Sequence, residues 1–132
     1  MEVTARTSGG YDSQYRKPLS FGIDIIKATI DIAMGKALDP LDLIPKYVMR
    51  SKTYSLMPEP GIIVSIEGLR EAQEIPGVHK IVVTSSVGNK IEEYKDCSIR
   101  TNFITISAPT SIELKKVQDA VNQLFVIKTV NN

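Results

Sequence analysis

Apolar side chains recur at helical spacing near the end of the chain and give its clearest secondary-structure signal. Their intervals of three, four and three residues place them on one face of a helix over residues 111–125. Thr110 and Glu113 have the spacing of a capping box, in which a hydroxyl and a carboxylate each bind a free N–H at the helix start. We therefore expect a helix that packs its apolar face into a core. That face consists of Leu114, Val117, Val121 and Leu124.

Segments rich in β-branched residues precede this helix, and clusters of Pro and Gly separate them. Residues 47–57 are expected to be extended, and a short helix from Leu69 is expected to close at Pro76-Gly77. From residue 62 the order of elements is β-α-β-β-α-β, which predicts an α+β fold. We expect a small antiparallel-sheet domain with both helices on one face. Its strands are expected over residues 62–67, 78–85, 99–107 and 126–128.

The N-terminal third contains a second helical pattern. Apolar residues recur on one helix face from residue 23 to residue 34, and Gly35 supplies a C-terminal stop. Residues 11–22 are polar and lack this periodicity, so we expect a loop there. The apolar positions of the helix are Ile23, Ile26, Ile30, Ala33 and Met34.

Two prolines follow this helix and limit what comes next. Asp39-Pro40 and Ile44-Pro45 interrupt any longer helix and permit at most a short helical turn. We therefore divide the chain into residues 1–44 and a C-terminal α+β domain over residues 45–132.

Composition describes an ordinary globular chain and excludes several functions. Apolar residues make up 42% of the 132 residues and charged residues 23%, with 16 basic and 15 acidic side chains well mixed. Because no block of like charge is present, we expect neither a nucleic-acid groove nor a membrane-binding patch. The single histidine, His79, has no partners at zinc-ligand spacing and is interpreted as a strand-surface residue. One cysteine, Cys97, and the absence of a targeting segment predict a cytoplasmic protein.

The first ten residues carry the candidate chemistry. Glu2, Thr4 and Arg6 alternate, so in a strand their side chains lie on one face. A carboxylate and a hydroxyl are ligands for Mg²⁺, and a guanidinium matches phosphoryl oxygens. The Ser8-Gly9-Gly10 segment that follows lets backbone N–H groups approach a ligand closely. An ordinary surface strand that runs into a flexible turn is the alternative interpretation.

The order of these motifs resembles the last catalytic segment of the ATP-grasp ligases, a superfamily that includes biotin carboxylase, carbamoyl phosphate synthetase and the amino-acid ligases. The resemblance rests on residues 2–10, 22–28 and 33–36. Further segments look like the C-terminal domain of the amino-acid-ligase and carboxylase branches, and the resemblance covers almost the whole chain. These segments are residues 60–63, 68–72, 76–78 and 108–113.

The resemblance implies a role for each candidate residue. Glu2 would hold Mg²⁺ on ATP, and Arg6 would contact the transferred phosphate or the substrate. Thr4 stands where the family usually has Asn, and its hydroxyl would be a weaker Mg²⁺ ligand than an amide carbonyl. Ser8, Gly9 and Gly10 would border the substrate. The polar residues that follow, Asp12, Arg16 and Lys17, would border the pocket of the acceptor substrate unless they belong to a solvated loop.

The resemblance also implies partners. The ATP lid, the adenine-binding strands and the first Mg²⁺ carboxylate of such ligases all precede this segment. We therefore expect an N-terminal ATP-grasp core, on the same polypeptide or on a split subunit, and no ATP or Mg²⁺ bound to this chain alone. A small carboxylate and an amine would be the substrates, and a homodimer is left open.

A second hypothesis treats the β-α-β-β-α-β unit as a small-molecule-sensing or dimerising regulatory module without catalysis. The N-terminal third separates the two hypotheses. A sensing module has no use for Glu2, Arg6 and the glycine pair, whereas a ligase fragment requires them.

Overall fold

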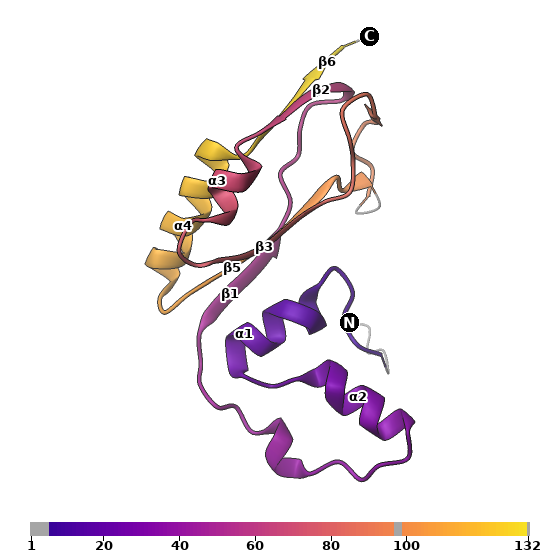
Figure 1. Cartoon of the computed structure of the whole chain (residues 1–132), viewed down its shortest axis with the longest axis vertical. Helices are drawn as coiled ribbons and strands as arrows, with labels where there is room; N and C mark the ends of the chain where they lie inside the picture. Colours follow the sequence, from indigo (N-terminus) through magenta and orange to yellow (C-terminus); the bar gives the residue numbers. More distant parts are fainter. Residues whose placement is uncertain (1–5, 97–98, 132) are drawn as a thin grey trace.

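The computed structural model describes residues 6–96 and 99–131. Glu2, Thr4 and Cys97 lie outside the described residues. The N-terminal helices lie beside a C-terminal part that holds the strands and two further helices (Figure 1). In chain order the elements are η1 (Asp12–Arg16), α1 (Lys17–Phe21), α2 (Ile25–Ala33), η2 (Pro40–Leu43), β1 (Arg50–Tyr54), β2 (Gly61–Glu67), α3 (Leu69–Gln73), β3 (Val78–Val83), β4 (Lys90–Ile91), β5 (Asn102–Ala108), α4 (Ser111–Leu124) and β6 (Val126–Val130).

The strands in the described part of the chain form two three-stranded antiparallel sheets. One has the order β1-β5-β3 and the other the order β4-β2-β6. The expected α+β class with antiparallel pairing is confirmed, and the strands after residue 62 are divided between the two sheets. Strand β1, from the segment expected only to be extended, completes the first sheet by pairing with β5, with Thr53 opposite Thr105.

The main core lies between the sheets and helices α3 and α4. Ile104 and Ile106 of β5 are fully buried against this cluster, which includes Ala72 from α3 and Val121 from α4. Helices α3 and α4 contact each other and the first sheet, and they lie on the same side of it in Figure 1. The expectation that both helices cover one face of a sheet is therefore confirmed.

The expected apolar face of α4 needs one correction. Leu114 and Val117 pack against the core and Val121 is fully buried, but Leu124 is 45% exposed. Phe125, only 1% exposed, fills the core position one turn after Val121. The three-residue step to Leu124 rotates its side chain to one edge of the apolar stripe, and the larger phenyl ring four residues on from Val121 takes the enclosed place.

The capping box at the start of α4 is confirmed. The Thr110 hydroxyl accepts a hydrogen bond from the Glu113 N–H at 3.2 Å, and the Thr110 N–H donates to the Glu113 carboxylate at 3.1 Å. Two backbone donors that the helix itself cannot satisfy are therefore paired.

Removing this cap is expected to lower the stability of the fold by a small but measurable amount. Thr110→Ala should lower the free energy of unfolding by about 1 kcal/mol, because the Glu113 N–H loses its acceptor. Ser111→Ala, one residue on, should change the free energy of unfolding by under about 0.5 kcal/mol. Urea denaturation of the two variants compares them directly, and equal losses would show that the box contributes nothing.

The expected loop over residues 11–22 is wrong for most of its length. Residues 12–16 form the π-helix η1, which continues into α1. Pro18 lies in the first turn of α1 and has no N–H to donate to the preceding turn of η1. Both helices are polar and short, so apolar periodicity gives no sign of them.

Helix α2 and the turn after it follow the sequence prediction. The Asp24 side chain caps α2 by accepting a hydrogen bond from the Lys27 N–H at 2.8 Å. Gly35 follows the helix end with φ +75°, a left-handed conformation that favours glycine. The expected short turn is η2. None of the helices in the described part of the chain is long and apolar enough to cross a membrane.

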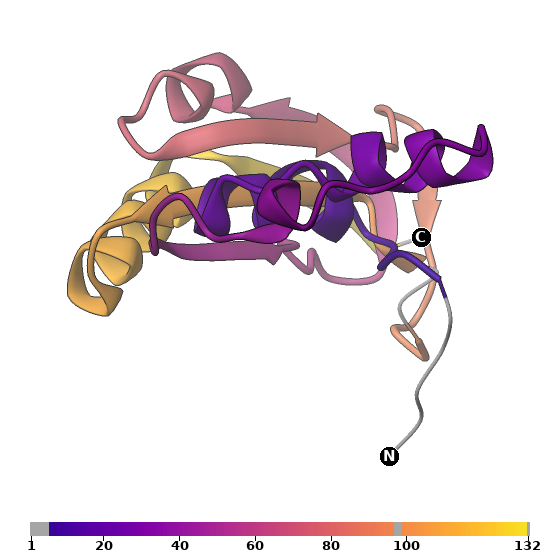
Figure 2. The ribbon, with the colours of Figure 1, turned by 90° about the horizontal axis from the view of Figure 1, so that it is seen from below.

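Helices η1 and α1 contact β1 and β5 on the side of the first sheet away from α3 and α4 (Figure 1), and the view from below has the N-terminal helices in front of the strands (Figure 2). The chain returns from η2 alongside α1, where the Lys46 N–H donates to Phe21 O and the Met49 N–H donates to Ser20 O, both at 2.9 Å. The boundary between residues 44 and 45 stays a prediction.

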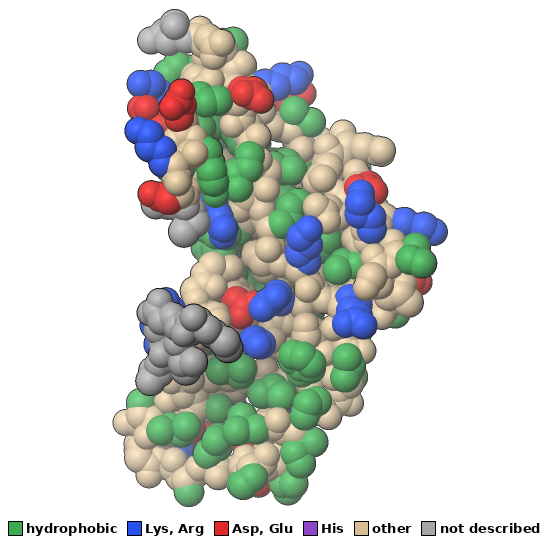
Figure 3. All heavy atoms as spheres, turned by 180° about the vertical axis from the view of Figure 1, so that it is seen from behind, with side chains coloured by type: hydrophobic (Ala, Val, Ile, Leu, Met, Phe, Trp, Pro, Cys, Tyr) green, Lys and Arg blue, Asp and Glu red, His purple; other side chains and the backbone are tan. Residues whose placement is uncertain are grey.

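An apolar surface is left exposed on the N-terminal part. Figure 3 shows hydrophobic side chains gathered over this end of the molecule, seen from behind. Helix α2 buries only Ala28, so most of its predicted apolar face is open to solvent. The large apolar residues exposed here are Ile30, Ile32, Met34, Leu41, Leu43, Ile44, Tyr47 and Val48.

Candidate functional site

Strand β5 presents two different faces, and the second one positions the candidate site. Ile104 and Ile106 point into the core, whereas Thr105 and Ser107 point the opposite way and are 2% and 5% exposed. Thr105 shares a hydrogen bond of 3.1 Å with Thr53 across the sheet. Helices η1 and α1 therefore rest on a sheet face that presents several hydroxyl groups beside the Phe103 ring.

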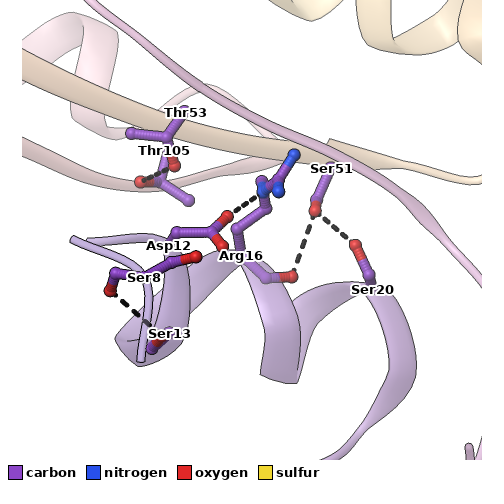
Figure 4. A network of polar contacts seen from close by, with 8 residues as sticks. All are labelled: Ser8, Asp12, Ser13, Arg16, Ser20, Ser51, Thr53 and Thr105. Carbon is purple, nitrogen blue, oxygen red and sulfur yellow. Dashed lines mark hydrogen bonds and ion pairs between the residues drawn. The ribbon is translucent and has the colours of Figure 1, made fainter. Parts of the chain in front are cut away.

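Hydrogen bonds from this face hold η1 and α1 in place (Figure 4). The Ser51 hydroxyl donates to the Arg16 carbonyl at 3.1 Å and also contacts the Ser20 hydroxyl. The Arg16 side chain forms an ion pair with Asp12 one turn earlier. Two of the polar residues noted from the sequence thus have structural roles, because Arg16 and Asp12 pair within η1 and the Arg16 carbonyl binds β1.

The turn between the N-terminal segment and η1 has an unusual backbone. Gly10 and Tyr11 both adopt left-handed conformations, with φ values of +63° and +64°, and the Asp12 N–H donates to Gly9 O at 3.3 Å. A tyrosine in this conformation carries strain, which the surrounding packing must offset. The Tyr11 ring packs edge-on against Phe103 of β5, with 5.1 Å between centroids. Sequence reasoning missed this anchor, because an aromatic residue after a glycine pair has no distinctive spacing.

A hollow of about 370 Å³ lies beside this turn. The Ser13 side chain is among its lining residues, is 4% exposed, and donates a hydrogen bond to Ser8 O at 3.0 Å. Of the residues predicted from the sequence, the hollow brings together Arg6, Ser8 and Lys17, while Gly9 and Gly10 are exposed in the turn and do not line it. The remaining lining residues are Thr7, Ile25 and Thr29.

The charge of this hollow is positive. Arg6 and Lys17 line it, and no acidic residue is among its lining residues within the described part of the chain. Among the described residues, Arg6 donates a hydrogen bond to the neighbouring carbonyl of Thr7, at 3.3 Å. The chemistry of the hollow therefore fits an anion, with two cations and several hydroxyls to bind its oxygens.

Other cations nearby are already paired. On α2 the Asp31 carboxylate accepts hydrogen bonds from Lys27 at 2.6 Å and Lys36 at 2.8 Å, and these lower the pKa of Asp31 to about 2. Asp31 therefore stays ionised and keeps both lysines engaged. Lys17 differs from them in having no ion pair with any described residue.

His79 is an exposed strand residue, as expected from the sequence. The ring is partly covered: its Nε2 lies 2.7 Å from the Ser107 hydroxyl, and this partial burial lowers the pKa of His79 below the usual value. No group of three or more His, Cys, Asp or Glu residues among those described could hold a metal ion. Glu2 and Thr4, the predicted Mg²⁺ ligands, lie outside the described residues.

A family model described as L-amino acid ligase C-terminal domain 2 matches residues 54–130, more than half of the chain. The chain belongs to this family. The resemblance to the C-terminal portion of an ATP-grasp ligase is thereby confirmed. No curated protein matches the sequence.

Two solved structures share the fold. Phosphoribosylglycinamide synthetase from Anaerococcus prevotii is similar with a TM-score of 0.80 at 14% identity, over 96% of this chain and 32% of that one. L-amino acid ligase from Bacillus licheniformis is similar with a TM-score of 0.79 at 22% identity, over 96% of this chain and 31% of that one. The chain thus spans about a third of the length of these two proteins.

Proposed function

We propose that this chain completes the active site of an ATP-dependent ligase that joins a carboxylate to an amine. In the proposed reaction a carboxylate oxygen attacks the γ-phosphorus of ATP, giving an acylphosphate and ADP. The amine then attacks the acyl carbon, and phosphate leaves as the amide forms. The family match and the cationic hollow that contains Arg6 support this proposal.

The candidate residues of this chain would have separate roles in this reaction. Arg6 would stabilise the oxygens of the phosphoryl group, and Ser8, Gly9 and Gly10 would border the substrate. Glu2 and Thr4 would hold Mg²⁺, which when bound neutralises charge on the phosphates. The described residues fit the part of such a site that binds an anion, since two cationic side chains and four hydroxyl groups line the hollow. They supply no adenine pocket, so ATP would be held mainly by another part of the enzyme.

The exposed apolar surface supports an N-terminal partner. Ile30, Met34 and Leu41 are each more than half exposed, and they belong to a continuous series along α2, η2 and the following segment. Single exposed apolar residues are ordinary, but a patch of this extent marks a contact with another domain. We propose that the ATP-grasp core, on the same polypeptide or a separate subunit, covers it in a cytoplasmic enzyme. The patch favours a chain that joins a further domain over a self-contained sensing module.

The chain alone is expected to hydrolyse no ATP and to bind MgATP no more tightly than about millimolar, because its described residues offer too few contacts for a nucleotide. Calorimetry with MgATP measures the affinity. Joined to its ATP-grasp core, the same chain should support ADP release that depends on both a carboxylate and an amine. A micromolar dissociation constant for the chain alone would contradict the proposal and favour a complete sensing site.

A further inference from the structure

We infer that Tyr11 is a positioning residue of the ligase reaction, because its ring packs on Phe103 and thereby fixes the turn over residues 8–10, here called the substrate turn. This inference rests on the proposed function, in which the substrate turn borders the substrate. It assigns to strand β5 the support of that turn.

The backbone of Tyr11 is held in a conformation that a tyrosine disfavours. Its φ is +64° and its ψ is 10°, and every other described residue with a positive φ is a glycine. A glycine adopts this left-handed conformation freely, whereas the Cβ of a tyrosine opposes it. Such strain persists only where the surroundings hold the residue in place, and it is common at functional sites. The Tyr11 side chain therefore supplies a contact that a third consecutive glycine could not.

That contact is with the central strand of the first sheet. The Tyr11 ring meets the Phe103 ring edge-on, with 5.1 Å between centroids and 69° between planes, and the Tyr15 ring lies 6.0 Å from it. These separations are those of favourable aromatic pairs. Strand β5 is paired on both sides, and the residues that flank Phe103, Asn102 and Ile104, are fully buried. Phe103 is thus a firmly held support for the Tyr11 ring.

Hydrogen bonds connect this support to the substrate turn. The Asp12 N–H donates to Gly9 O at 3.3 Å, and the Ser13 hydroxyl donates to Ser8 O at 3.0 Å (Figure 4). Both donors come directly after Tyr11 in the chain, so a shift of Tyr11 moves both hydrogen bonds. Ser8 and Ser13 line the hollow, whereas Tyr11 is not among its described lining residues. Tyr11 therefore acts through the substrate turn and not by touching the substrate.

This indirect role predicts a particular kinetic effect. A displacement of about 1 Å in a group that positions a substrate can lower the rate about 100-fold. ATP would be held mainly by the ATP-grasp core, so its binding should not depend on Tyr11. Loss of the ring should therefore lower kcat and raise KM for a substrate at the turn, while KM for MgATP stays unchanged. A smaller fraction of folded enzyme would lower kcat but change no KM.

The test uses the ligase with its ATP-grasp core. Tyr11→Asn removes the ring but keeps a residue that tolerates the left-handed backbone, and Tyr11→Phe keeps the ring. Tyr94→Asn, at a tyrosine that is 49% exposed between β4 and β5, is the matched control. Tyr11→Asn should lower kcat by about 10- to 100-fold and raise KM for the carboxylate or the amine by about 3- to 10-fold. KM for MgATP should change by less than about 2-fold, and Tyr11→Phe and Tyr94→Asn should match the wild type in every constant within about 2-fold.

Phe103→Leu tests the same contact from the other side, since it keeps an apolar side chain in the sheet and removes the ring that supports Tyr11. This variant should also lower kcat. Combining it with Tyr11→Asn should lower kcat by less than about 2-fold beyond Tyr11→Asn alone, because the contact is already absent. Melting temperatures show which variants are folded in the assay. If Tyr11→Asn is not, Tyr11→Gly replaces it, because glycine relieves the backbone strain.

Four results would overturn the inference. The first is wild-type kinetics of Tyr11→Asn, and the second is an equal loss in Tyr11→Phe, which would assign the effect to the hydroxyl. The third is independent losses in the double variant, which would show that Tyr11 does not act through Phe103. The fourth is a lower kcat with every KM unchanged, which would indicate less folded enzyme. If the wild type still forms ADP with a carboxylate and an amine, only this inference fails, and if it forms none, the proposed function fails as well.

Discussion

Replacing Gly68 with alanine is expected to lower the free energy of unfolding of this chain by about 2–6 kcal/mol. Gly68 joins β2 to α3 with φ +68°, which costs a non-glycine residue about 1–3 kcal/mol. A Cβ there would lie 1.9 Å from the carbonyl oxygen of Leu124, at the end of α4. That oxygen belongs to the backbone, so the chain itself must shift, and overpacking of this kind adds about 1–3 kcal/mol.

Gly35→Ala is the matched control. Gly35 has a similar φ of +75°, but a Cβ there meets no atom within 4 Å. Replacing Gly35 should lower the free energy of unfolding only through this backbone conformation, by about the same 1–3 kcal/mol. Urea denaturation of both variants isolates the contact with Leu124. If Gly68→Ala is no less stable than Gly35→Ala, the close approach of α3 and the end of α4 is not as described.

Changing Glu2 to glutamine in the ligase with its ATP-grasp core is expected to slow turnover about a hundredfold to a thousandfold. The amide keeps the shape of the side chain but removes the negative charge proposed to hold Mg²⁺. Loss of one such electrostatic contact raises a barrier by about 3–4 kcal/mol. Arg6→Lys should also be poorly tolerated, because an ammonium cannot reproduce bidentate contact with a phosphoryl group.

The alternative for Glu2 makes the opposite prediction. A carboxylate on an ordinary surface strand would leave turnover unchanged and alter stability by under about 0.5 kcal/mol when replaced by an amide. Glu71→Gln, on the exposed side of α3, provides the comparison. Steady-state kinetics and the melting temperature of both variants distinguish the two cases, and wild-type turnover of Glu2→Gln would remove Glu2 from the site.

The sequence predicted the elements whose signals are local. Helix α4 could be predicted because its apolar stripe and the capping box at Thr110 lie within a few residues of each other. Helices η1 and α1 were missed because their stability comes from contacts with Ser51, more than thirty residues away. The division of the strands into two sheets likewise could not be predicted from the sequence, since the pairing of β1 with β5 joins segments that are far apart in the chain.

The candidate site, too, could be predicted only as far as its signals are local in the sequence. The motif order identified the segment that contains Arg6 and Ser8, and the polar residues after it included Lys17. Nothing local separates Lys17 from Arg16, although one lines the hollow and the other is bound to Asp12. The role of Gly68 also cannot be predicted from the sequence, because the carbonyl of Leu124 lies close to it only in the folded chain.

The hydroxyl-lined face of β5 bears on how such enzymes are assembled in evolution. Thr105 and Ser107 share hydrogen bonds with Thr53 and His79 of the same sheet and could also bind water, so this face tolerates exposure better than an apolar one. A unit with a water-compatible joining surface is easily recombined with different preceding segments.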